Sequence, residues 1–246
     1  MVVAGRAQRR CSWLLRSGFR SLHRQTGEQD LRVSEDAPDW LAWHSPYLDP
    51  SSSLSRRLGI IQEHITDWLN QRPGVPLTAV SICAGQGHDL IGVLAHRADA
   101  HRVHATLLEY DERNVAAARA AAETAGLADV LVRQADAGDP AAYRGAVPAD
   151  LVLLAGVFGN IDDADISTTI AALPQLCSRA ATVIWTRSRR PPDRTGAIRA
   201  WLAEAGFAEV SFTAPPDDLF SVGVHQLTAS PEPLTARTPL FRFTRS

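Results

Sequence analysis

The sequence predicts a doubly wound α/β fold with a mostly parallel, seven-stranded sheet and an N-terminal helical extension. Short apolar runs alternate with amphipathic segments of helical period between residues 79 and 213. This alternation is typical of βαβ units, in which helices cover both faces of a parallel sheet. The length of 246 residues and the hydrophobic content of 45% suit one well-packed domain of this class.

An amphipathic helix is predicted ahead of the sheet. From Leu54 to Trp68 the apolar residues recur every three or four positions, behind a run of three serines at 51–53 that can cap a helix. The sequence Pro-Gly-Val-Pro at 73–76 ends the pattern. We expect this helix to lie against the main body, as part of a cap formed by residues 28–75.

The body, residues 76–246, contains the predicted strands and helices in order. Six apolar runs predict strands at 79–83, 104–109, 130–134, 150–155, 181–186 and 210–213. Helices are predicted at 89–98, at 112–125 with Gly126 as its stop, between Asn160 and Pro174, and around Ile198 and Leu202 up to Gly206. Two late candidates, 222–227 and 240–244, complete the sheet, and we expect the strand at 240–244 to run antiparallel.

Charge is unevenly placed along the chain. All 25 basic residues are Arg, and residues 1–27 hold six of them without any acid, which leaves a net charge of −8 on the remainder. An acidic body argues against a nucleic acid partner.

The Arg-rich start fits a mitochondrial transit peptide, a basic arm, or residues upstream of the true start in a bacterial gene. We favour the last and expect 1–27 to be dispensable.

The lengths of the apolar runs and the spacing of the cysteines indicate in which cellular compartment the protein acts. No apolar run approaches the roughly 20 residues that a membrane-spanning helix needs. Cys11, Cys83 and Cys177 are odd in number and widely separated, which argues against a disulfide framework and against a zinc site. We expect a cytoplasmic protein without a bound metal.

Three successive strand ends carry residues that suit an adenosine-containing cofactor. Ligands of open parallel sheets bind beyond the carboxyl ends of the strands. After the first strand, Gly85 and Gly87 permit a tight turn close to a ligand. Glu109 ends the second strand, where a carboxylate can accept both hydroxyl groups of a ribose. Asp136 follows the third, where it can accept a hydrogen bond from an adenine amine.

Each of these features also has a plainer interpretation. Paired glycines occur in turns that bind nothing, and Asp136 can be a turn-forming residue. Glu109 can be the acid that favours the start of the next helix, although Asp111 or Glu112 can fill that role. The occurrence of all three features at the correct successive positions favours the cofactor site.

These residues resemble the class I S-adenosylmethionine-dependent methyltransferases over positions 78–213. Cys-Ala-Gly-Gln-Gly-His-Asp at 83–89 is similar to that family's acid-x-G-x-G-x-G loop, Leu-Glu-Tyr-Asp at 108–111 to its ribose-binding strand end, and Asp-Ala at 136–137 to its adenine-binding turn. Residues 150–154 resemble the strand whose far end faces the transferring methyl group. The segments 83–89, 156–160 and 185–187 also resemble a branch of the family from GC-rich bacteria.

The resemblance implies a Rossmann-like fold, S-adenosylmethionine as the methyl donor, and a small molecule as the acceptor. It implies a cofactor site formed by Ala84, Gly85, Gln86, Gly87, Asp89, Glu109, Tyr110, Asp136, Ala137 and Gly156.

Two departures from the family's glycine loop concern the charge near the cofactor. Cys83 stands where the family usually has an acid, and Asp89 stands where it usually has the third glycine. Asp89 can take over from the missing acid, or it can simply favour the start of the following helix. Leu90 occupies the position where a dinucleotide-binding loop has its third glycine, which argues against a nicotinamide cofactor.

Methyl transfer from a sulfonium needs alignment more than catalytic groups. If the acceptor is a hydroxyl or an amine, His225 or His88 are the candidate bases, although a lone His is more often a packed residue. The aromatic segment 40–49 can form a lid over the cofactor or attach the extension to the flank of the sheet.

The sequence thus predicts a small-molecule methyltransferase. The alternatives are a catalytically silent S-adenosylmethionine-binding sensor or partner subunit and, with less support, an NAD(P)-dependent oxidoreductase. Methyl transfer to nucleic acid is disfavoured, because neither an Asn-Pro-Pro-aromatic nor an Asp-Pro-Pro-aromatic motif follows the fourth strand.

Overall fold

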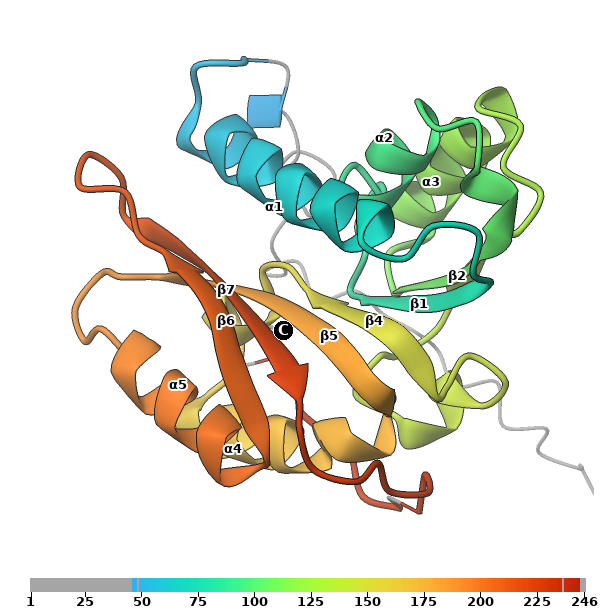
Figure 1. The fold of residues 1–246 in the computed structure, drawn as a ribbon. Coiled ribbons are helices and arrows are strands. Elements are labelled where there is room, and N and C mark those ends of the chain that lie inside the picture. Colours follow the sequence, from blue (N-terminus) through green and yellow to red (C-terminus); the bar gives the residue numbers. More distant parts are fainter. Residues whose placement is uncertain (1–45, 48, 236, 244–246) are drawn as a thin grey trace, which may run out of the picture. The chain divides into compact units, whose positions relative to one another are not determined.

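A single seven-stranded sheet forms the centre of the fold, in the order β3-β2-β1-β4-β5-β7-β6 (Figure 1). The computed structural model describes residues 46, 47, 49–235 and 237–243. The strands are β1 Leu77–Ile82, β2 Val103–Glu109, β3 Val130–Gln134, β4 Ala149–Leu154, β5 Cys177–Ser188, β6 Phe207–Thr213 and β7 Phe220–Leu227. Strands β1 to β5 pair in parallel, and β7 runs antiparallel to both β5 and β6. The predicted doubly wound, mostly parallel sheet is confirmed.

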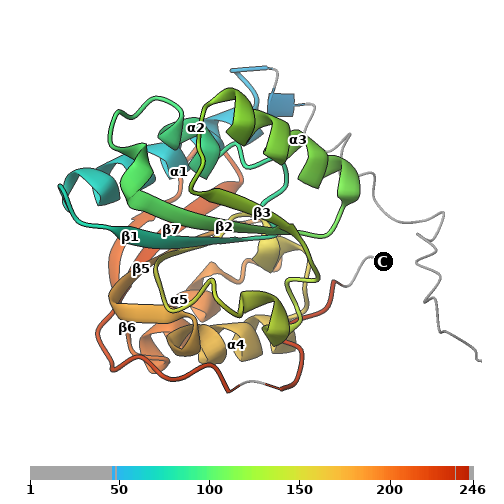
Figure 2. The same cartoon turned by 90° about the vertical axis from the view of Figure 1, so that its right-hand side faces the viewer.

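Helices cover both faces of this sheet (Figure 2). On one face lie α1 Ser53–Asn70, α2 Leu90–Leu94 and α3 Glu112–Thr124, and on the other lie α4 Asp163–Ala172 and α5 Thr195–Glu204. Short 3-10 helices complete the connections: η2 Ala100–Arg102, η3 Pro140–Tyr143, η4 Val157–Gly159 and η5 Leu173–Gln175. Each face has its own apolar core, so the inner parallel strands are buried on both sides, whereas the edge strand β3 is partly exposed.

The amphipathic helix predicted before the sheet is α1. The Ser52 hydroxyl accepts the Ser55 N–H at 3.0 Å and so caps the first turn, as the serine run predicts. The apolar stripe of α1 packs against β7 and α2, with Ile61 and Ile65 buried in the core of that face. Helix α1 therefore belongs to the body of the fold.

Helix α2 is shorter than the sequence predicts. It covers Leu90–Leu94 instead of 89–98, because the chain closes with tighter turns in which His96 N–H donates to Val93 O and Arg97 N–H donates to Leu94 O. The stop predicted for α3 is confirmed, since Gly126 follows it with a φ of 68°.

The prediction of a strand at 240–244 is wrong for the residues that the structure describes. Leu240 and Phe241 are 2% exposed and fill the core, but their segment pairs with no strand. The Leu240 N–H donates to Gly138 O at 2.8 Å, and the Leu240 carbonyl accepts the Thr169 hydroxyl at 2.9 Å. The backbone is thus satisfied by a loop and by α4, and the antiparallel strand of the sheet is β7.

Several expectations fall outside the described residues. These include the basic segment 1–27 and most of the aromatic segment 40–49, of which Pro46, Tyr47 and Asp49 are described. No helix in the described part combines the length and apolarity that crossing a bilayer requires. Among the same residues, no group of three or more His, Cys, Asp or Glu side chains is arranged to hold a metal ion.

Candidate functional site

A glycine loop turns the chain at the carboxyl end of β1. Cys83, Gly85 and Gly87 adopt positive φ angles of 54°, 56° and 73°, a region that residues with a side chain rarely occupy. A methyl group on Gly87 would lie 2.6 Å from Ile91 and 2.8 Å from Leu107. The loop therefore needs glycine at position 87 both for its backbone angle and for its packing.

Glu109, the last residue of β2, holds this loop through its carboxylate. Its Oε2 accepts the Gly85 N–H at 2.8 Å, and its Oε1 accepts the Asp111 N–H at 2.9 Å. The Ala84 N–H of the same loop donates to Leu108 O at 2.9 Å. Glu109 is 7% exposed, and each of its oxygens uses one of its two lone pairs in these bonds. The carboxylate is therefore oriented and keeps acceptor capacity for further donors.

The Asp136 side chain closes the turn after β3. Its Oδ1 accepts the Gly138 N–H at 2.8 Å, as the plainer interpretation of this residue predicts, and the residue remains exposed. The end of β3 lies beside the end of β2, because the Ala135 N–H donates to Glu109 O at 2.9 Å. Asp136 is thus both a turn-forming residue and a solvent-facing carboxylate next to Glu109.

Tyr110 and Ala137, the residues that follow these two acids, differ in exposure. Tyr110 is 56% exposed, and its carbonyl accepts the side-chain amide of Gln134 at 3.3 Å. Ala137 is buried, and its carbonyl accepts the Tyr143 hydroxyl at 2.6 Å. The Tyr110 ring is therefore available to a ligand, whereas the Ala137 side chain is part of the core.

The Cys83 thiol lies near both acids. Burial raises the pKa of this thiol well above its usual range, and the nearby Glu109 and Asp136 carboxylates raise it further. The thiol is therefore neutral at the position where the sequence resemblance implies an acid. The structure brings together the glycine loop, the end of β2 and the turn after β3.

Asp89 caps the N-terminus of α2. Its Oδ1 accepts the Leu90 N–H at 2.7 Å, and the residue is 6% exposed. Burial raises the pKa of Asp89 to about 6, although the backbone hydrogen bonds and the Arg57 charge act in the opposite direction. Asp89 is consequently a buried carboxylate at the end of the glycine loop.

Side chains from α1 and from the segment before it reach the same place. The Arg57 Nη2 donates to the Tyr47 hydroxyl at 3.4 Å, and the Tyr47 ring lies 5.0 Å from the His88 ring between centroids. Burial raises the pKa of Tyr47, the Arg57 charge opposes this, and the Asp89 charge adds to it. Tyr47, one of the described residues of segment 40–49, thus packs against the glycine loop.

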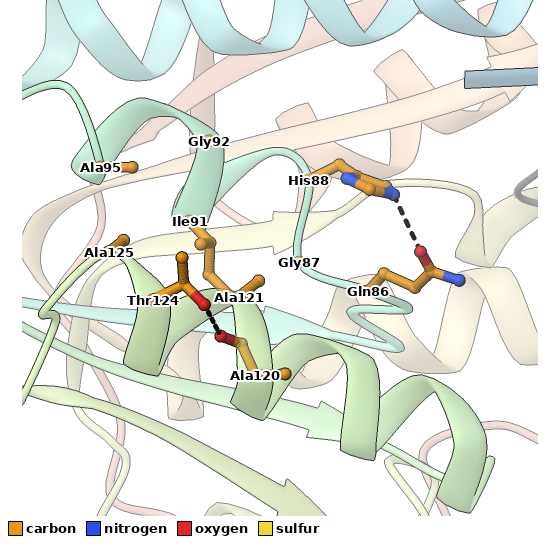
Figure 3. Close-up of a pocket in the computed structure, with 10 residues that line it drawn as sticks. All are labelled: Gln86, Gly87, His88, Ile91, Gly92, Ala95, Ala120, Ala121, Thr124 and Ala125. Carbon is orange, nitrogen blue, oxygen red and sulfur yellow. Dashed lines mark hydrogen bonds between the residues drawn. The ribbon is translucent and has the colours of Figure 1, made fainter. Parts of the chain in front are cut away.

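A cavity of about 560 Å³ lies between α2 and α3 (Figure 3). Gln86, Gly87 and His88 line it from the loop, and small side chains of the two helices line the rest. His88 Nε2 and Gln86 Oε1 are 3.1 Å apart, as Figure 3 shows. Neither Glu109 nor Asp136 lines this cavity. It is therefore distinct from the place where the acids of the strand ends meet.

The loop after β4 is fixed to the neighbouring strand. Gly156 has a φ of 87°, and its N–H donates to the Thr186 hydroxyl of β5 at 2.8 Å. The Gly156 carbonyl accepts the Asn160 side-chain amide at 2.8 Å. The carboxyl ends of β4 and β5 are thus held side by side.

His225, the candidate base, lies in the core of β7 and is 1% exposed. Its Nδ1 accepts the Trp185 Nε1–H at 3.2 Å, and its Nε2 is 3.7 Å from Glu209 Oε2. Burial lowers the pKa of His225 to about 4. His225 pairs with Val183, two residues before the Trp185–Leu154 pair that marks the carboxyl end of β4. The structure therefore does not bring its imidazole to the glycine loop.

Sequence reasoning missed two charged residues near the strand ends. Asp218, in the β6–β7 turn, forms a two-point ion pair with Arg56 of α1, at 2.7 and 2.8 Å. Arg187 is the penultimate residue of β5 and contacts the loop after β4. Arg56 and Asp218 are 162 positions apart, so no local pattern signals their contact. The sequence marks Arg187 only as part of the segment 185–187 that resembles a branch of the family.

Solved structures with a similar fold include methyltransferases. An O-methyltransferase family protein from Burkholderia thailandensis is 16% identical, with a TM-score of 0.58 over 78% of this chain and 60% of that one. Magnesium protoporphyrin IX methyltransferase from Synechocystis, with bound SAH, is 14% identical, with a TM-score of 0.59 over 76% and 92%. A Bordetella parapertussis protein described as a possible exported protein is 16% identical, with a TM-score of 0.62 over 79% and 81%. At such identities the likeness shows a shared fold.

The family comparison is more specific than these structural likenesses. Residues 56–199, more than half of the chain, match the family described as "Putative methyltransferase". The chain belongs to this methyltransferase family. The match includes the glycine loop, Glu109, Asp136 and the loop after β4. A comparison with curated proteins finds no match.

Proposed function

We propose that this protein transfers the methyl group of S-adenosylmethionine to a small molecule. The observation that carries the proposal is the buried Glu109 carboxylate, which braces the glycine loop through Gly85 while keeping free lone pairs at the end of β2. A ribose diol supplies the two donors that such an acceptor needs. Family membership supports the reaction type.

The adenosine half of the cofactor is assigned to the ends of β1, β2 and β3. Glu109 would accept the ribose hydroxyls, and Asp136 would accept the adenine amine with the oxygen that does not close its turn. Tyr110 would lie against the adenine with its exposed ring. The backbone of Ala84, Gly85, Gln86 and Gly87 would line the cofactor, with Ala137 behind the adenine and Gly156 near the methyl group.

The methionine half of the cofactor is assigned to the end of the glycine loop nearest α2. Its ammonium group needs a negative partner, and Cys83 is a neutral thiol. Asp89 is the buried acid at that place, and Arg57 is close enough to influence its charge. An Asp and an Arg together suit the two charges of an amino acid group, which explains how the loop functions without its usual acid.

The bound sulfonium supplies an already activated methyl group, so this chain's residues mainly orient it. The Gly156 loop, held to β5 through Thr186, forms the wall beyond β4. His225 is a neutral, buried acceptor for Trp185, so we infer that it packs the core and does not act as a base. His88 faces Gln86 and Tyr47 and stays a candidate for contact with the substrate.

The other functions considered are less well supported. A silent S-adenosylmethionine-binding sensor would use the same cofactor site, and only turnover separates it from an enzyme. An NAD(P)-dependent oxidoreductase would need a third glycine where Leu90 stands, and this side chain is fully buried in the core. The acidic body favours neither DNA nor RNA as an acceptor.

The free thiols Cys83 and Cys177 fit a reducing compartment, which supports a cytoplasmic location.

The function is tested by calorimetric titration of the full chain with S-adenosylhomocysteine, NAD and NADP. We expect saturable binding of S-adenosylhomocysteine alone, and preferential binding of NAD or NADP would overturn the proposal. Release of S-adenosylhomocysteine from S-adenosylmethionine with a panel of small acceptors then separates the enzyme from the silent binding protein. Binding without any acceptor-dependent release would support the silent alternative.

A further inference from the structure

An arginine lies against the loop that follows β4. Trp185 of β5 pairs with Leu154, the last residue of β4, so Arg187 stands beyond the end of that strand. The Arg187 Nη1 donates to Phe158 O at 2.6 Å. Its guanidinium therefore rests on the turn η4, immediately after Gly156.

Arg187 is a partly buried cation that no described carboxylate contacts. Burial lowers the pKa of Arg187, and its Nε is buried without a hydrogen-bond partner in the described part of the chain. The nearby acids are engaged elsewhere: Asp163 pairs with Arg194 at 2.8 Å, and Asp193 accepts the Thr195 N–H at 2.9 Å. A cation held in this way is stabilised when an anion reaches it.

Charges of both signs lie near Arg187: Asp163 and Asp193 favour its charged form, and Arg194 opposes it. Arg189 binds the backbone carbonyls of Pro215 and Asp218 in the β6–β7 turn, and Arg190 is exposed just beyond the strand. The chain outside residues 1–27 carries a net charge of −8, yet three of the four residues at 187–190 are arginines. Local positive charge at a site edge attracts anionic ligands.

We propose that Arg187 recognises an anionic oxygen group, a carboxylate or a phosphate, on the methyl acceptor. The planar guanidinium matches both groups and donates in parallel to two of their oxygens. The position of Arg187 next to Gly156, away from the acids of β2 and β3, assigns it to the acceptor and not to the cofactor. This inference rests on the proposed function and narrows its substrate class to acids or phosphate esters.

The inference is tested by nitrogen-15 spectra of arginine side chains in the full chain saturated with S-adenosylhomocysteine. The Arg187 Nε–H signal is identified by its loss in Arg187→Gln. Benzoate, inorganic phosphate and the neutral probe benzamide are then titrated at constant ionic strength. We expect benzoate or phosphate to shift this signal in a saturable way, and benzamide to leave it unchanged. Of the two anions, the one that saturates the shift at the lower concentration indicates whether the group on the acceptor is a carboxylate or a phosphate.

Matched variants control for charge and for folding. Arg179→Gln removes the same charge from an exposed position near the opposite end of β5 and should leave the response of the Arg187 signal intact. Arg187→Lys keeps the charge but not the planar fork, so anion binding, followed by calorimetry, should weaken several-fold without vanishing. Melting curves of all variants exclude unfolding as a cause.

The two proposals fail in different ways. Absence of S-adenosylhomocysteine binding in the wild-type chain contradicts the proposed function. A chain that binds S-adenosylhomocysteine while the Arg187 signal ignores both anions, or responds equally to benzamide, contradicts only the inference about the acceptor. Loss of S-adenosylhomocysteine affinity in a folded Arg187→Gln variant would assign Arg187 to the cofactor and overturn the inference as well.

Discussion

Gly85 and Glu109 are joined by a hydrogen bond of 2.8 Å from the glycine N–H to the carboxylate Oε2. The bond connects the loop after β1 to the end of β2, 24 positions along the chain. The same carboxylate binds the Asp111 N–H with its other oxygen. Glu109 therefore organises the site before any ligand arrives, and a change at this residue affects the loop and the cofactor together.

Asp136 should contribute less to cofactor binding than Glu109. Asp136→Asn keeps an oxygen for the Gly138 N–H but removes the charge offered to the adenine amine. We expect S-adenosylhomocysteine affinity to fall by about 0.5 to 1.5 kcal/mol, the range for one hydrogen bond, as measured by calorimetry. Asp136→Ala should in addition lower the melting temperature. Equal stability of the two variants would contradict the role of Asp136 in the turn.

The charge of Asp89 should make cofactor binding depend on pH. Its pKa is raised to about 6 by burial, so the carboxylate that would hold the methionine ammonium forms only as the pH rises through that value. Affinity for S-adenosylhomocysteine should increase between pH 5 and pH 7 in the wild-type chain, and this increase should be absent in Asp89→Asn. A wild-type affinity that does not change over this range would remove Asp89 from the ammonium site.

The same group should influence folding with a defined sign. A carboxyl whose pKa is higher in the folded state than its usual value of 3.8 binds its proton more tightly there. Its contribution to stability is therefore present below about pH 4 and is lost as the pH rises through about 6. Asp89→Asn lacks this loss, so at pH 7 the variant should unfold at higher urea concentration than the wild type. A less stable variant at pH 7 would contradict the assignment.

His225→Gln should leave methyl transfer nearly unchanged. A glutamine oxygen can still accept the Trp185 Nε1–H, so the core keeps its hydrogen bond. A general base typically contributes a rate factor of about 10² to 10⁴, and a loss of that size would restore His225 as the base.

The pKa of the His225 imidazole is about 4, below its usual 6.5, so the wild-type stability should fall as the pH drops from about 6.5 towards 4. Urea unfolding of His225→Gln should show a smaller fall over the same pH range.

Gly87→Ala should destabilise the fold more than Gly126→Ala. Both glycines have positive φ, at 73° and 68°, so both variants incur a strain of about 1 to 2 kcal/mol. Only at Gly87 does the new methyl group meet Ile91 and Leu107, which adds about 1 to 3 kcal/mol for overpacking. Urea unfolding of the two variants measures the difference in their free energies of unfolding. Equal losses of stability would show that the glycine loop shifts to accommodate the methyl group at position 87.

Sequence patterns predicted the parallel strands and the positions of the two acids well, for a physical reason. Strands buried on both faces read as continuous apolar runs, and residues at their carboxyl ends meet at one edge of the sheet. Glu109 and Asp136 could thus be placed near Gly85 without knowledge of any contact. The family resemblance supplied the assignment of ribose and adenine roles.

Other features depend on contacts that a local pattern does not encode. Leu240 and Phe241 look like a strand, but they are buried as an irregular segment because Gly138 and Thr169 satisfy the Leu240 backbone. His225 occupies an apolar run that places it in the core, and only the strand register shows how far it lies from the end of β4. The place of Arg187 beside the loop after β4 follows from its hydrogen bond to Phe158, which lies 29 positions earlier in the chain.

The most direct measurement of the central claim is the affinity of S-adenosylhomocysteine for Glu109→Gln compared with the wild type, by calorimetry at pH 7.5. The glutamine keeps one oxygen for the loop but loses the charge and half of the acceptor capacity. We predict a loss of about 1.5 to 3 kcal/mol, or about tenfold or more in affinity, in a variant whose far-ultraviolet spectrum and melting curve show a folded chain. A folded Glu109→Gln protein that binds S-adenosylhomocysteine as tightly as the wild type would contradict the account.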